Sequence, residues 1–166
     1  SAHKERVGRD GAFIQLYTSG TTGAPKGVAV PAFAIAAFTA YMRYGFGVTA
    51  DDVFWNGADP GWAYGLYYAM LGPLAIGRPN ILLAPNFSPG VVQRVVDELG
   101  VTNFASAPTA YRALRRDGVR FARRLRVASS AGEPLTPDIT AWSPEALGCV
   151  VRDHWGQTEQ GMAIVN

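Results

Sequence analysis

One stretch of the chain combines glycines, hydroxyl side chains and a lysine within twelve residues, running from Tyr17 to Val28. Glycines let backbone N–H groups approach an anion without a Cβ in the way, and a run of such groups forms an anion-binding concavity. The neighbouring hydroxyls add hydrogen-bond donors, and Lys26 adds a point charge. The segment therefore predicts a phosphate-binding loop whose contacts come from Thr18, Ser19, Gly20, Thr21, Thr22, Gly23 and Lys26.

The residues around the lysine exclude a Walker-type loop. That motif places a glycine directly before the lysine and a serine or threonine directly after it, at the start of a helix. Here Pro25 precedes Lys26, Gly27 follows it, and residues 28–30 look extended. A solvated Ser/Thr/Gly turn between two strands is the plain alternative, which a twelve-residue string this particular disfavours.

The elements around this loop predict an α/β fold with a mostly parallel sheet flanked by helices. Strands are expected at 13–17, 28–30, 52–55, 81–83, 103–106, 125–128 and from 150 onward. Helices are expected at 31–44 (with Phe33, Ala37, Tyr41 and Tyr44 on one face), 62–71 (ended or kinked by Pro73), 89–99, 109–117 and from 137 onward. Strands that alternate with helices favour a parallel sheet, in which ligands bind at the carboxyl ends of the strands. The loop after Tyr17 and the segments 131–134 and 153–159 are all expected at that edge.

Composition restricts the class of protein. The 166 residues are 48% hydrophobic and carry a net charge of +2, which suits one globular domain and gives no reason to expect a nucleic-acid partner or a membrane surface. The uncharged runs 28–42 and 62–77 fall short of the roughly 20 apolar residues that span a bilayer. A single cysteine, Cys149, is expected to be a small apolar residue rather than a nucleophile, and it fits a reducing, cytoplasmic compartment.

Three segments in order carry a family resemblance. Residues 17–28 resemble the signature of the adenylate-forming (AMP-binding) superfamily of acyl-CoA synthetases, luciferases and peptide-synthetase adenylation domains. Residues 130–134 resemble its adenine-binding segment, and residues 155–159 its aromatic-Gly-x-Thr-Glu motif. Residues 59–62 and 107–109 are similar to the acetyl- and medium-chain acyl-CoA synthetase branch.

The resemblance implies attack of a carboxylate on the α-phosphorus of ATP, followed by transfer of the acyl group to CoA, with Mg²⁺ as cofactor. Because a carboxylic acid of pKa ~4–5 is already ionised at neutral pH, the first step needs no general base. The residues implied in catalysis are Lys26, Thr158 and Glu159, with Glu159 also ligating Mg²⁺. Those implied in nucleotide binding, besides the loop, are Gly132, Glu133, Pro134, Asp153, His154, Trp155, Gln157 and Thr158. Trp155 would lie against adenine; His154 taken alone favours a structural or surface residue, and Thr158 taken alone a helix cap.

The resemblance also bears on the acid. The acetate-specific branch has a tryptophan where this chain has Gly156, so glycine is expected to leave volume for a medium-chain, branched or aryl acid larger than acetate. The other expected pocket walls, for which plain core positions are the alternative, are Trp62, Ala63, Tyr64 and Ala131.

The resemblance covers part of the family's length. It implies a partial AMP-binding domain over residues 1–166, a fragment of the large N-terminal domain, without the C-terminal lid domain and with little complete catalysis of its own. Two alternatives stay open: a non-catalytic nucleotide-binding or assembly module, and an amino-acid or aryl-acid adenylating domain. Seven arginines between 112 and 126 predict a solvated helix and loop rather than a nucleic-acid face, and a site for the phosphates of CoA stays open.

Overall fold

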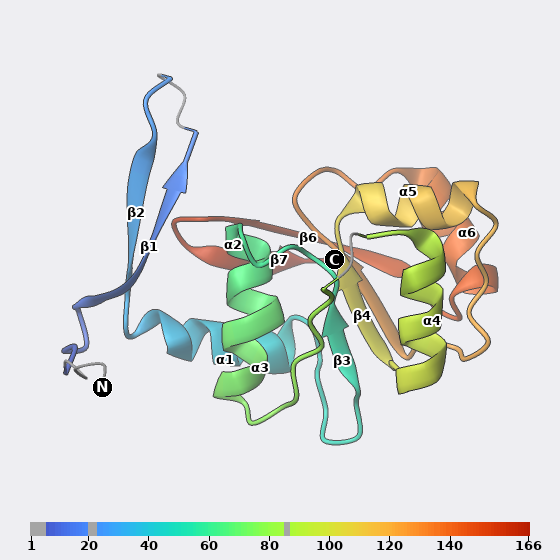
Figure 1. The fold of residues 1–166 in the computed structure, drawn as a ribbon, viewed down its shortest axis with the longest axis horizontal. Coiled ribbons are helices and arrows are strands. Elements are labelled where there is room, and N and C mark those ends of the chain that lie inside the picture. The colour runs from blue at the N-terminus through green and yellow to red at the C-terminus, as the bar shows by residue number, and fades with distance from the viewer. Residues whose placement is uncertain (1–5, 20–22, 85–86) are drawn as a thin grey trace.

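The computed structural model describes residues 6–19, 23–84 and 87–166. Its centre is a five-stranded sheet in the order β3-β4-β5-β6-β7 (Figure 1). The first four strands run parallel: β3 (Phe54–Asn56), β4 (Asn103–Ser106), β5 (Val127–Ser130) and β6 (Val151–Gln157). The edge strand β7 (Gly161–Val165) pairs antiparallel with β6. The predicted α/β fold with a mostly parallel sheet is confirmed.

Helices cover both faces of the sheet, because successive strand residues point to opposite sides. On one face, α4 (Pro89–Leu99), α5 (Pro108–Arg116) and α6 (Pro137–Ala146) enclose a core that includes Trp55 and Phe104. On the other face, Phe54 and Ala105 belong to a second core. That core is formed with α1 (Ala34–Tyr44), α2 (Ala63–Gly65), the π-helix η1 (Leu66–Leu71) and α3 (Gly72–Ala75).

Helix α4 shows how local residues set the boundaries of an element. The Ser88 side chain accepts a hydrogen bond from the Val91 N–H at 3.3 Å and caps the helix, and Pro89 occupies its first turn. Gly100 ends it in the left-handed conformation, with φ 67°. Val92 and Val96 are fully buried, so the predicted apolar face is confirmed, although Leu99 at its end is exposed.

Helix α1 begins later than predicted and uses a different face. Pro31 is the last residue of a strand, because a proline without an N–H is tolerated at a strand end as well as in a first helical turn. The buried residues of α1 are Phe38 and Met42, whereas Phe33 and Tyr44 of the predicted stripe are exposed. The predicted face is therefore wrong.

The segment 63–75 is helical throughout, and Pro73 does not end it. The helix widens instead into η1, where the Gly72 N–H donates to the carbonyl of Tyr67, five residues earlier. Such i→i+5 turns are rare and often occur at functional sites. Tyr67 and Tyr68, consecutive residues of η1, both reach the β6–β7 hairpin with their hydroxyl groups.

Two further expectations about strands are corrected. Residues 81–83 form no strand, and they line a groove beside β3 without pairing with it. The strands β1 (Ala12–Thr18) and β2 (Lys26–Pro31) form a separate antiparallel hairpin that extends away from the five-stranded sheet (Figure 1). Phe13, Ile14 and Val28 of this hairpin pack against the second core.

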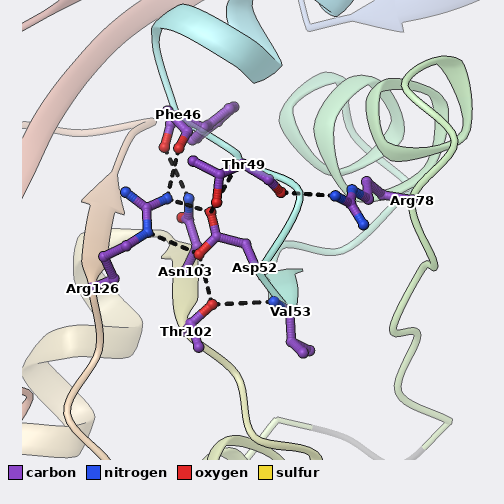
Figure 2. A network of polar contacts seen from close by, with 9 residues as sticks. Phe46, Thr49, Asp52, Val53, Arg78, Thr102, Asn103 and Arg126 are labelled. Atoms are coloured by element: carbon purple, nitrogen blue, oxygen red, sulfur yellow. Dashed lines mark hydrogen bonds and ion pairs between the residues drawn. The ribbon is translucent and has the colours of Figure 1, made fainter.

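A buried carboxylate ties together the segments that lead into β3, β4 and β5 (Figure 2). Asp52 Oδ1 accepts from the Thr102 hydroxyl at 2.7 Å and from Arg126 Nε at 2.9 Å, and Oδ2 accepts from the Thr49 N–H at 2.8 Å and from the Arg126 guanidinium. Burial raises the pKa of Asp52, but the hydrogen bonds from Arg126, Thr49 and Thr102 outweigh it and lower the pKa to about 2. The amino ends of three parallel strands are thereby fixed at one point.

Candidate active site

Two of the three motif segments meet at the carboxyl edge of the sheet. Ser130 at the end of β5 is in register with Asp153 of β6, so residues 131–134, which follow β5, lie beside the last part of β6 and the turn that follows it. This edge is where parallel α/β sheets bind their ligands. The structure thus brings the predicted adenine-binding segment beside the predicted aromatic-Gly-x-Thr-Glu motif.

The segment after β5 is a sharp turn next to a tryptophan. Gly132 has φ +104°, and a Cβ built there would lie 3.2 Å from the Trp62 ring, so only glycine fits without displacing that ring. Glu133 and Pro134 are exposed, and Glu133 forms an ion pair with Arg112 at 2.8 Å. The turn therefore offers backbone atoms and one carboxylate, with Trp62 packed beside it.

Strand β6 presents alternating side chains to the core and to solvent. Asp153 is anchored, because its Oδ2 accepts from the Leu135 N–H at 3.4 Å and its N–H donates to the Asn166 side chain at 3.0 Å. Trp155 is 49% exposed, which leaves a large aromatic face open to a planar ligand. Gln157, the last residue of the strand, is also exposed.

His154 points in the opposite direction, into the core. It is 3% exposed, and its Nδ1 lies 3.0 Å from the Tyr41 hydroxyl, which donates its own proton to the carbonyl of Ile164 at 3.1 Å. His154 Nδ1–H is therefore the donor toward Tyr41. Burial, together with Arg152, lowers the pKa of His154 to about 4. Because the imidazole is enclosed by Tyr41 and Phe46, it offers almost no exposed surface to a ligand, and the contact of His154 with a nucleotide remains a prediction.

The turn between β6 and β7 consists of Thr158, Glu159 and Gln160. The Thr158 carbonyl accepts a hydrogen bond from the Tyr67 hydroxyl at 2.9 Å, whereas the Glu159 side chain is exposed and forms no ion pair with any described residue. Burial, reinforced by the negative charge of Glu159, raises the pKa of Tyr67 to about 12. The carboxylate thus lies close to Tyr67 and stays open to solvent.

Gly156 does not border free volume. A Cβ at this position would lie 2.3 Å from the Gly161 carbonyl oxygen and 2.6 Å from the Met162 Cα, where the ladder between β6 and β7 shifts its register. The expectation that glycine leaves an empty space here is wrong for this arrangement of the hairpin. Gly156 instead lets the two strands approach closely.

The other predicted pocket walls lie in or next to the second core. Tyr64 and Ala131 are buried there, Ala63 is half-buried, and Trp62 is 40% exposed. A groove of about 460 Å³ lies instead between the end of β3 and residues 81–84. The assignment of these residues to an acid pocket therefore remains a prediction.

The described parts of the phosphate loop, residues 17–19 and 23–28, lie at the end of the β1–β2 hairpin and not at the edge of the parallel sheet as expected. Thr18 and Lys26 are directly opposite each other in the antiparallel register, and Lys26 and Ser19 are exposed. Gly23 has φ +82°, a conformation that glycine adopts readily. The predicted contacts at Gly20, Thr21 and Thr22 lie outside the described residues. The hairpin thus brings a lysine and two hydroxyl residues to one exposed end.

The β6–β7 turn offers an oxygen ligand that is compatible with a magnesium site completed by water and substrate phosphates. Among the residues that the structure describes, no group of three or more His, Cys, Asp or Glu side chains forms a metal cage. Mg²⁺ commonly takes one or two carboxylates and completes its shell with water and substrate phosphates. The solvent-open carboxylate of Glu159 fits such a site.

The arginines between 112 and 126 are largely compensated by acidic neighbours. Ion pairs join Arg115 to Asp138 at 2.6 Å and Arg120 to Glu145 at 2.9 Å, and further pairs involve Arg112, Arg116 and Arg126. Most of these side chains are at least 38% exposed. This pattern is that of a solvated helix and loop.

Sequence reasoning missed the tyrosines whose hydroxyl groups hydrogen-bond to the backbone of the β6–β7 hairpin. The hydroxyls of Tyr41 and Tyr67 donate to carbonyls of the hairpin, and the Tyr68 hydroxyl accepts from the Met162 N–H at 2.8 Å. These tyrosines precede the hairpin by about ninety positions or more in the sequence, so no local pattern connects them. The consecutive tyrosines 67 and 68 in an uncharged segment were the one available signal.

These features define an α/β domain in which two of the three motif segments lie at neighbouring strand ends. The chain matches the family model of AMP-binding enzymes over residues 2–166, and it belongs to that family. The acetyl-coenzyme A synthetase of Xanthomonas axonopodis pv. citri is 38% identical to it, over 98% of this chain and 27% of that protein. The acetyl-coenzyme A synthetase of Bacillus subtilis is 34% identical, over 95% of this chain and 28% of that protein.

A solved structure agrees with this assignment. The acyl-CoA synthetase of Brucella canis superposes with a TM-score of 0.89 at 49% sequence identity, over 95% of this chain and 30% of that one. The chain thus spans less than a third of the length of these relatives. Within the described ranges, no helix combines the length and the hydrophobicity needed to cross a membrane.

Proposed function

We propose that this chain is part of the ATP-binding domain of an AMP-forming acyl-CoA synthetase, and that the full-length protein joins a carboxylic acid to CoA. The observation that carries the proposal is the adjacency of residues 131–134 and 154–159 at the carboxyl edge of β5 and β6, with Trp155 and Glu159 open to solvent. Most of the relatives' length lies outside the matched region, so the complete activity is assigned to the full-length protein.

In the first step, a carboxylate oxygen of the acid forms a bond to the α-phosphorus of ATP. The bond from that phosphorus to the bridging oxygen breaks, and pyrophosphate leaves with the electron pair. The acid is ionised at neutral pH, so no side chain has to remove a proton. In the second step, the CoA sulfur attacks the acyl carbon, AMP leaves, and the thiol proton passes to solvent.

The residues of this chain have electrostatic and positioning roles in the first step. Lys26 and the hydroxyls of Thr18 and Ser19 in the β1–β2 hairpin hold the β- and γ-phosphates. The Thr158 hydroxyl donates to the α-phosphate. Trp155 stacks on adenine, with the backbone of residues 132–134 on the other side of the ring. Asp153 and Gln157 lie beside the nucleotide. Glu159 would hold Mg²⁺, which when bound neutralises phosphate charge.

The acid is proposed to be larger than acetate only because the acetate-specific branch has a tryptophan where this chain has Gly156; the space around Gly156 in this arrangement of the hairpin does not support it. Because a Cβ at this position meets the β7 backbone, Gly156→Trp would disturb the hairpin and gives no clean test. The direct test is a panel of acids with the unmodified protein. Acetate, propionate, butyrate, hexanoate and benzoate should be compared by ATP–pyrophosphate exchange, and the highest kcat/KM is expected for an acid with more carbons than acetate.

The same assay tests the function itself. Lys26→Met should lower the exchange rate roughly 100-fold or more, because it removes a fixed positive charge from the phosphate chain. Arg94→Met removes a charge from the exposed side of α4 and should leave exchange unchanged.

If no acid supports exchange although ATP binds in calorimetry, the protein is a non-catalytic nucleotide-binding module. A preference for an amino acid would assign it to the amino-acid adenylating domains.

A further inference from the structure

The turn that carries Thr158 and Glu159 is held from behind by the π-helix η1. The Tyr67 hydroxyl donates to the Thr158 carbonyl oxygen at 2.9 Å, across 91 positions of sequence. That carbonyl belongs to the peptide that joins Thr158 to Glu159. One hydrogen bond therefore constrains the orientation of both residues that the proposed function places on the phosphates.

The tyrosine itself has little freedom to move. Tyr67 is 1% exposed, and its ring stacks on Phe38 of α1 with centroids 4.5 Å apart and planes 21° apart. Its neighbour Tyr68 is equally buried and packs edge-on against both Phe38 and Tyr67. The hydroxyl of Tyr67 thus extends from a packed aromatic core, in which displacement would cost packing energy.

The other end of the turn is fixed by the same helix. The Tyr68 hydroxyl accepts from the Met162 N–H at 2.8 Å, and a Cβ on Gly161 would lie 2.6 Å from that hydroxyl. Two features favour glycine at position 161, which follows the turn. Its φ of +74° is a conformation that other residues rarely adopt, and a side chain would collide with the Tyr68 hydroxyl. The widened turn of η1 lets two consecutive hydroxyls reach the two ends of one three-residue turn.

We propose that Tyr67 is a positioning residue for the first chemical step, which it serves by fixing the peptide between Thr158 and Glu159. This inference rests on the proposed function, since it takes the roles of these two residues from it. Without the Tyr67 hydroxyl, the Thr158 carbonyl would hydrogen-bond to water. The exposed turn would then sample orientations in which the Thr158 hydroxyl and the Glu159 carboxylate miss the phosphates.

The test is Tyr67→Phe in the full-length protein, measured by ATP–pyrophosphate exchange. Misplacement of catalytic groups by about 1 Å can cost on the order of 100-fold, so kcat is expected to fall roughly 10- to 100-fold. The KM for the acid should stay unchanged, because the turn does not hold the acid. A kcat within about threefold of the unmodified protein would overturn the proposal.

Tyr41→Phe is the matched control. It removes a hydroxyl that also donates to a carbonyl of the same hairpin, at 3.1 Å, but to Ile164 near the far end of β7. Because the Tyr41 hydroxyl also hydrogen-bonds to His154, Tyr41→Phe should cost at least as much stability as Tyr67→Phe, whereas only Tyr67→Phe should lower kcat. If the two variants lower kcat equally, the hydroxyls merely stabilise the hairpin and the positioning role is wrong.

A double-mutant cycle separates this inference from the proposed function. If Tyr67 acts through the turn, Tyr67→Phe should cost less in a Thr158→Ala background than alone, and the remaining effect should come from Glu159. Full additivity of the two effects would overturn the positioning role. If Thr158→Ala alone leaves exchange unchanged, the proposed role of Thr158 fails, and the inference fails with it. If Thr158→Ala abolishes exchange and Tyr67→Phe does not affect it, only the inference fails.

Discussion

At the scale of single residues, two buried titratable side chains have distinct consequences. The carboxylate of Asp52 is buried but surrounded by donors, so its pKa falls to about 2, whereas burial keeps the imidazole of His154 neutral with a pKa of about 4. The hydrogen bonds outweigh desolvation at Asp52, and no comparable donor set stabilises a charge at His154. Asp52 therefore stabilises the folded state at neutral pH, whereas His154 destabilises it only as the pH falls below the pKa of a free imidazole, about 6.5.

The lowered pKa of Asp52 predicts a specific dependence of stability on pH. A group whose folded pKa lies below its unfolded value of about 4 stabilises the protein above that pH, and this contribution is lost as the pH falls toward about 2. Asp52→Asn should therefore lower the free energy of unfolding at pH 7, and its difference from the unmodified protein should shrink between about pH 4 and pH 2. Urea unfolding across this range measures both quantities.

The neighbouring exposed carboxylate of Asp51 supplies the control. Asp51→Asn makes the same chemical change outside the hydrogen-bond network and should leave the pH profile close to that of the unmodified protein. A difference between Asp52→Asn and the unmodified protein that stays constant from pH 7 to pH 2 would show that the charge of Asp52 does not stabilise the fold.

At the scale of elements, the two ends of α4 have glycines with opposite requirements. Gly100 ends the helix with φ +67°, where a side chain is strained, whereas Gly90 lies in the first turn with open space around its Cβ position. Gly100→Ala should lower the free energy of unfolding by about 1–2 kcal/mol. Gly90→Ala should raise it by about 0.5–1 kcal/mol, because alanine has less freedom in the unfolded chain.

Chemical denaturation of both variants measures the pair. We expect the two variants to change the free energy of unfolding in opposite directions. This result would show that α4 ends at Gly100 because of its left-handed conformation, and not because of helix propensity in general. A Gly100→Ala variant as stable as the unmodified protein would mean that the chain can end this helix in another conformation.

The same elements show why the sequence predicts some parts of the fold and not others. Ser88 and Gly100 act on their immediate neighbours, so the ends of α4 could be predicted from local chemistry. Residues 81–83 have the apolar composition of a buried strand, yet they line a groove, because composition does not specify pairing. Strand β7 pairs through the shifted register of β6 and had no local signal.

The candidate site divides in the same way. The motif residues around Lys26, Gly132 and Glu159 could be identified because each group is contiguous in the sequence. The orientation of His154 and the closed space at Gly156 depend on β7 and α1, which are distant in the sequence or were not predicted. For the same reason, the Tyr67 contact could only be found in the structure.

At the scale of the whole molecule, the chain leaves large apolar side chains open along one side of the sheet. Strand β3 is the edge strand among the described residues, and beside it lie Leu82, 52% exposed, and Phe87, 40% exposed. An unpaired edge next to an apolar groove is a common site of association between chains. We expect the 166-residue chain, prepared by itself, to self-associate through this groove.

Sedimentation velocity tests that expectation. Leu82→Lys and Phe87→Lys together should shift the isolated chain toward monomer. Leu74→Lys, on the exposed surface of α3, removes a side chain that is 62% exposed elsewhere and should not. Association that is unaffected by the groove variants would place the contact on another surface.

The network around Asp52 has a consequence for how this protein can change over generations. It fixes β3, β4 and β5 at the ends opposite to the proposed chemistry, through contacts that include no predicted site residue. Substitutions at the carboxyl edge can therefore accumulate without loosening the strands beneath them. If the proposed function holds, new acid preferences can be selected, or engineered, in the loops of that edge while the strands keep a single arrangement.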